Sequence, residues 1–152
     1  MQFQVPLSII TFLTISGQTL GASLFGLYRI QQTFNGEDLV LTGQGNDSAP
    51  TFETPAGEGS QIWRFEDQGD NTTIIESVAT KQYLNCDSGS CLESATAQTF
   101  YVEYQGPYQY TFLDLSHGRS LHSTDESGIA LARISAESDD QIFEVIRVEF
   151  CE

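Results

Sequence analysis

The chain has 152 residues, 39% of them hydrophobic, and a formal net charge of −15. This length fits one domain with a single hydrophobic core. A strongly acidic surface repels phosphate backbones and anionic lipids, so we expect no nucleic-acid partner and no membrane binding. We therefore expect a neutral or basic partner. The alternative is that the charge serves solubility alone.

The first segment in chain order is an apolar run at residues 5–15, which small and polar residues follow as far as residue 23. The run is too short to span a bilayer, which takes about 20 apolar residues. We interpret residues 1–22 as a secretory signal peptide and residues 23–152 as a mature, secreted protein. The alternative is a buried first strand, because no Lys or Arg precedes the run.

Two further features agree with export to an oxidising compartment. Asn46 and Asn71 each begin an Asn-x-Ser/Thr triplet, the acceptor motif for N-glycosylation. Cys86 and Cys91 flank a turn rich in Ser and Gly, so we predict a disulfide between them. Cys151 is left over, either as a free thiol or as half of an intermolecular bridge. Three reduced cysteines in an intracellular protein are the alternative.

The remaining sequence has the pattern of an all-β domain. Its patterned stretches are short, rich in β-branched and aromatic residues, and separated by Gly, Asn, Asp and Ser. In chain order the expected strands are 26–30, 38–41, 62–65, 72–75, 100–104, 108–113 and 142–148. Many short strands at close spacing are typical of a barrel or a sandwich. No linker or low-complexity tract interrupts them, so we expect one domain.

An internal repeat narrows the architecture. Three times, a strand, a turn and a Leu-centred strand precede a Gln-x-aromatic triplet, which begins at Gln61, Gln98 and Gln141. This pattern resembles the β-trefoil, and in particular the ricin-B-type lectin repeat with its Gln-x-Trp signature. The resemblance implies a six-stranded barrel capped by three hairpins. It implies pseudo-symmetric repeats of about four strands each, at about 26–71, 72–109 and 110–150, in a single domain spanning 23–152.

The same resemblance assigns six side chains to the core because they occupy matching places in the three repeats. They are Trp63, Phe100, Phe143, Leu39, Leu84 and Leu121.

The family's sugar site does not carry over residue by residue. In ricin-like lectins an Asp on the second strand binds sugar hydroxyls, an aromatic ring stacks on the sugar, and an Asn precedes the Gln-x-Trp. Where the Asp is expected, this chain has Leu41-Thr42, Asn85-Cys86 and His122-Ser123. Where the Asn is expected, it has Ser60, Ala97 and Asp140.

Two looser sets of residues remain as candidates for carbohydrate binding. Each combines carboxylate or amide groups in one loop region, and the first also has an aromatic residue on its third strand. Ordinary solvated loop residues are the alternative for both sets. The first-repeat set is Asp47, Phe52 and Gln61, and the third-repeat set is His122, Asp125, Asp140 and Gln141.

A second resemblance is to small fungal β-trefoil protease inhibitors, which share the opening Tyr28-Arg29-Ile30 type of strand and the repeat plan. Such inhibitors act through an exposed loop, and the candidate loops are 43–50, 54–60 and 123–128.

Enzymatic motifs are missing. The chain has two histidines, His117 and His122, and contains neither His-Glu-x-x-His nor Gly-x-Ser-x-Gly. We therefore expect a secreted, non-catalytic module that binds carbohydrate and needs no cofactor or metal. Its partner is a glycan or, in the alternative, an extracellular protein such as a protease.

Overall fold

The computed structural model describes residues 22–124, 128–136 and 138–149. Within these ranges the chain forms twelve strands and two three-residue 3-10 turns. The first repeat contains β1 (Gly26–Phe34), β2 (Glu37–Thr42), β3 (Thr51–Glu53), η1 (Gly59–Gln61) and β4 (Trp63–Gly69). The second contains β5 (Thr72–Ser77), β6 (Tyr83–Asn85), β7 (Leu92–Ser94) and β8 (Phe100–Gly106). The third contains β9 (Gln109–Asp114), β10 (Arg119–Ser123), β11 (Ile129–Arg133), η2 (Asp139–Gln141) and β12 (Phe143–Arg147).

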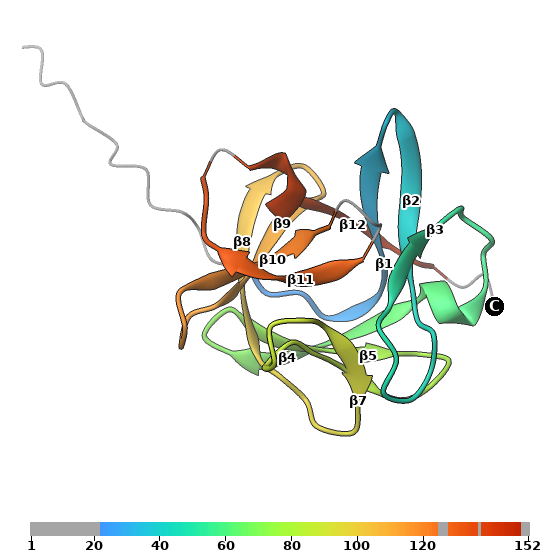
Figure 1. Cartoon of the computed structure of the whole chain (residues 1–152), viewed down its shortest axis with the longest axis horizontal. Coiled ribbons are helices and arrows are strands. Elements are labelled where there is room, and N and C mark those ends of the chain that lie inside the picture. The colour runs from blue at the N-terminus through green and yellow to red at the C-terminus, as the bar shows by residue number, and fades with distance from the viewer. Residues whose placement is uncertain (1–21, 125–127, 137, 150–152) are drawn as a thin grey trace, which may run out of the picture.

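Six of the strands close a barrel. The antiparallel pairs around it are β1·β4, β4·β5, β5·β8, β8·β9, β9·β12 and β12·β1. The other six strands form the hairpins β2·β3, β6·β7 and β10·β11. Figure 1 shows the repeats around a common centre, the first from blue to green, the second in green to yellow and the third in orange to red. This arrangement is the predicted β-trefoil, so the fold prediction is confirmed.

The closing aromatic residues fill the centre of the barrel, as predicted. Trp63, Phe100 and Phe143 are fully buried, each at the first position of a barrel strand where the alternation of faces turns its side chain inward. The Trp63 Nε1–H donates to the Leu41 carbonyl oxygen at 2.8 Å, so the one polar atom of this ring is satisfied.

One predicted core residue is displaced by two positions. Leu84 and Leu121 are fully buried as expected, but in the first repeat the equivalent residue is Leu41, which has no exposed surface. Leu39 is half-buried and packs at the margin of the core. Both side chains lie on the same face of β2, and the fully buried one, Leu41, pairs with buried Phe52.

The predicted disulfide between Cys86 and Cys91 is present, and both residues are fully buried. Residues 1–21 of the predicted signal peptide, together with Asp125 and Cys151, lie outside the described ranges. Ala22, which we placed in that peptide, donates its N–H to the Val102 carbonyl oxygen at 3.0 Å. No helix within the described ranges is long and apolar enough to cross a membrane.

Candidate functional site

The first-repeat set is not assembled as a sugar site. Phe52 is 3% exposed, with its ring 5.3 Å from that of Phe34 and 6.2 Å from that of Phe143, centroid to centroid. A sugar cannot stack on a ring whose faces are already packed, so the assignment of Phe52 as a stacking platform is wrong. The error is one of strand parity, because Phe52 lies on the inward face of β3 opposite Leu41. Asp47 is exposed, in a turn with a positive φ of 56°.

The two candidate glutamines are structural, which is a further correction. Gln61 is 2% exposed; its Oε1 accepts from the Ala56 N–H at 2.7 Å and its Nε2 donates to the Thr54 carbonyl oxygen at 2.9 Å. Gln141 is 4% exposed and binds the backbone of Ser135 and Arg133 in the same way. Each side chain therefore holds the loop between the third strand and the closing strand of its repeat, and is occupied there.

His122 and Asp140 do lie together at the surface of the third repeat. The His122 Nδ1 is 3.8 Å from the Asp140 Oδ2 and 3.0 Å from the Ser123 carbonyl oxygen. Because a carbonyl oxygen only accepts, Nδ1 carries the hydrogen, and Nε2 is the acceptor of a neutral ring. The Asp140 Oδ1 accepts a hydrogen bond from the Ser138 hydroxyl. The hydrogen bond from Ser138 orients the Asp140 carboxylate, which lies at the middle position of η2.

A groove of about 460 Å³ runs beside Asp140, between the third repeat and the first. Across the groove from η2 and the end of β10 lies the last part of β1 with its turn. An adjoining hollow of about 400 Å³ continues past Gln109, Ile142 and Glu144 and shares part of the lining. The residues along the main groove are Gln32, Thr33, Phe34, Asn35, Ser123, Thr124, Asp139 and Asp140.

Gln32 lines both hollows, and its buried side-chain oxygen is an unused acceptor. Its Nε2 donates to the Asp139 carbonyl oxygen at 2.9 Å, which fixes the amide plane. Its Oε1 is buried, and no group in the described parts of the chain donates a hydrogen bond to it. Buried acceptors are almost always paired, because leaving one unpaired costs about 1 to 3 kcal/mol. Because this oxygen has no accessible surface, a ligand hydroxyl or amide could pair with it, and remove that cost, only after the Gln32 side chain moves.

The groove is also negatively charged. Asp139, Asp140 and Glu144 line the two hollows, and neither lining contains a Lys or Arg. The lining suits a neutral, hydroxyl-rich or cationic ligand and repels an anionic one. Among the described residues no group of three or more His, Cys, Asp or Glu side chains is placed to hold a metal ion.

Comparison with solved structures identifies the type of fold. ThreeFoil, a designed threefold-symmetric protein, is 16% identical over 81% of this chain and 99% of its own, with a TM-score of 0.68. The agglutinin of Rhizoctonia solani is 17% identical over 82% of this chain and 96% of its own, at 0.67. The ricin B-like lectin of Macrolepiota procera, solved in complex with lactose, is 13% identical over 84% and 99%, at 0.69. The chain has the β-trefoil fold, which it shares with these proteins. No family model and no curated protein sequence matches the chain.

Sequence reasoning found one side of the groove in this β-trefoil and missed the other. Asp140 was predicted, but Gln32 and Phe34 come from the opposite end of the chain and belong to no motif. They reach the site because β1 and β12 pair with each other and close the barrel. Their place in the groove can be predicted only once the pairing of β1 with β12 is known.

Proposed function

We propose that this protein is a non-catalytic carbohydrate-binding module of the extracellular space, and that the groove between β1 and η2 is its sugar site. The observation that carries the proposal is the buried, unpaired Gln32 Oε1 beside the carboxylates of Asp139 and Asp140. Sugars are recognised through hydroxyls that donate to carboxylate and amide oxygens, and these are the acceptors that line the groove. The carbohydrate-bound lectin among the solved structures of the same fold supports the proposal.

A screen of the purified protein on a glycan array tests this function. We expect neutral glycans to bind, and sialylated or sulfated ones to be rejected because the groove already holds carboxylates. Asp139→Asn and Asp140→Asn should each weaken binding by about tenfold, equivalent to about 1.4 kcal/mol. Asp87→Asn is the matched control, an exposed acidic residue in the second-repeat turn outside the groove. Its affinity should equal that of the wild type.

A protease panel measured in parallel separates this proposal from the inhibitor alternative. Inhibition without glycan binding would contradict the carbohydrate proposal. So would a preference for sialylated glycans, or unchanged affinity in both groove variants. The thermal unfolding midpoints of the three variants should stay near the wild-type value, since none of the substitutions removes buried apolar surface.

A further inference from the structure

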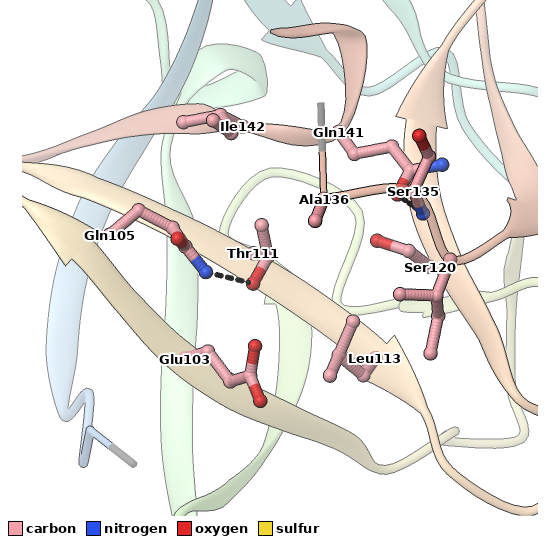
Figure 2. A pocket seen from close by; sticks show the side chains of 10 residues that line it. Glu103, Gln105, Thr111, Leu113, Ser120, Ser135, Ala136, Gln141 and Ile142 are labelled. Atoms are coloured by element: carbon pink, nitrogen blue, oxygen red, sulfur yellow. Dashed lines mark hydrogen bonds between the residues drawn. The ribbon is translucent and has the colours of Figure 1, made fainter. Parts of the chain in front are cut away.

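A second, smaller hollow lies on the wall of the third repeat, and it shares only Ile142 with the groove system. Its volume is about 150 Å³. Figure 2 shows Glu103, Gln105 and Thr111 projecting from β8 and β9 on one side, and Ala136 and Ile142 facing them across the space. An apolar cavity of about this size accommodates one benzene molecule, so the pocket fits a group of a few heavy atoms.

The third repeat carries small residues at two positions in the wall of this pocket. The strand registers identify the equivalents, since Thr111 pairs with Glu103 as Arg29 pairs with Ile146 and as Ile74 pairs with Glu66. Ser120 likewise precedes the core leucine Leu121, as Val40 and Tyr83 precede theirs. At these two positions the first repeat carries the larger residues Arg29 and Val40, and the second carries Ile74 and Tyr83. Arg29 and Ile146 line a separate hollow, with the charged Arg29 in place of Thr111.

The lining combines apolar walls with unused polar groups. Leu113 is 6% exposed and forms the floor, and Ile134 is 44% exposed at the edge. The Thr111 Oγ1 accepts from the Gln105 Nε2 at 3.1 Å, which leaves its hydroxyl hydrogen to donate. Within the described ranges the Glu103 carboxylate has no salt-bridge partner and accepts no side-chain hydrogen bond. One acceptor, one donor and a methyl-sized apolar wall therefore surround one small space.

We propose that this pocket binds the acetamido group of a 2-acetamido sugar. The amide N–H donates to the Glu103 carboxylate, the carbonyl oxygen accepts from the Thr111 hydroxyl, and the methyl group packs on Leu113 and Ile134. A hydroxyl group alone would leave the apolar wall without a partner, and a carboxylate would be repelled by Glu103. A protonated amine would pair with Glu103 but would set a strongly hydrated charge against Leu113 and Ile134. The inference rests on the carbohydrate-binding function proposed above and adds a second subsite to it.

Titration with N-acetylglucosamine, followed through the methyl NMR signals of Leu113, Ile134 and Ala136, tests this assignment. Glucose is the matched probe, because it differs at the acetamido position alone. We expect N-acetylglucosamine to shift these signals and glucose to leave them in place. Thr111→Ile introduces the side chain that the second repeat carries at this position, and should weaken the response about tenfold. Glu103 is half-buried at the edge of the pocket, so Glu103→Ala is the second test variant if Thr111→Ile does not fold. It should weaken the response several-fold.

Asp87→Asn, in the exposed turn of the second repeat, is the control variant, and it should leave the response of the pocket unchanged. Equal shifts from glucose and N-acetylglucosamine would overturn the inference, as would a full response in Thr111→Ile or in Glu103→Ala. Binding of glycans at the groove with no response of the pocket methyl groups would overturn this inference alone. If no glycan binds at either place, both the inference and the proposed function fall.

Discussion

Replacing Glu93 by leucine tests how a buried carboxylate holds one repeat against the next. Glu93 has no exposed surface, and it pairs with Leu84 as Phe52 pairs with Leu41 in the first repeat. Its Oε2 accepts from the N–H groups of Gln44 at 2.5 Å and Gly45 at 2.7 Å. Its Oε1 accepts from the Thr80 hydroxyl at 2.6 Å. A carboxylate stands where the first repeat uses an apolar residue, and it fixes the loop at residues 43–48.

The magnitude follows from these three contacts. A hydrogen bond to a charged group contributes about 1.5 to 3 kcal/mol, so losing all three costs about 5 kcal/mol. Burial of the leucine side chain offsets about 2 kcal/mol of this, which leaves a net loss of about 3 kcal/mol. Glu93→Gln keeps an oxygen for both N–H groups and can donate to Thr80, so it should lose only about 1 kcal/mol.

Urea unfolding at neutral pH measures both variants, with the fluorescence of Trp63, the one tryptophan in the chain, as the signal. The expected order of stability is wild type, then Glu93→Gln, then Glu93→Leu. A Glu93→Leu variant as stable as the wild type would contradict the role assigned to these three hydrogen bonds. It would mean that an apolar residue suits this position as well as Phe52 suits its own.

Three further predictions concern other buried or tightly packed residues. Gly43→Ala places a Cβ 2.8 Å from the Glu93 Oε1 and 3.1 Å from the Ser77 Oγ, so it should cost about 1 to 3 kcal/mol in urea melts. The cost should be smaller in a Glu93→Ala background, where only the close contact with Ser77 remains. Trp63→Ala should lower the unfolding free energy by about 3 to 5 kcal/mol, measured by circular dichroism; an unchanged midpoint would contradict the core assignment. Burial raises the pKa of the Asp114 carboxyl, but hydrogen bonds from the His117 and Arg119 side chains outweigh this and hold the pKa below its ordinary value. Its stabilisation is therefore present above about pH 4 and lost as the pH falls through the folded-state pKa, so the stability gap between wild type and Asp114→Asn should narrow in acid; a constant gap would argue against it.

The architecture could be predicted because it is repeated in the sequence. A Gln-x-aromatic triplet appears three times in the sequence. In each repeat the Gln side chain binds the backbone of a loop and the aromatic side chain enters the barrel, so the same structural requirement is visible at three places in the sequence. Gln98 illustrates this, since its Oε1 accepts from the Cys86 N–H at 2.6 Å. The short disulfide could be predicted for a similar reason, because a turn and its two flanking residues are local in the chain.

The site depended on information that the repeat does not carry. Phe52 was misplaced because an aromatic residue on a short strand faces either the core or solvent, and three residues are too few to fix the alternation. Buried Glu93 breaks the binary pattern outright, and only its contacts with a distant loop explain it. The groove depends on the meeting of β1 with η2, and the two small residues in the wall of the pocket are at positions known only from the register.

The most direct test of the groove as the sugar site is a titration of the ¹⁵N-labelled protein with the neutral oligosaccharide that binds best on the array, mapped by amide chemical shifts. We expect the largest shifts at Gln32, Thr33, Asn35, Asp139 and Asp140, and an Asp140→Asn variant should reach saturation only at about tenfold higher ligand concentration. The amides of the second-repeat hairpin, β6 and β7, should stay in place. Shifts centred on that hairpin, or on the exposed loop around Asp47, would place the sugar elsewhere and contradict the assignment of the groove.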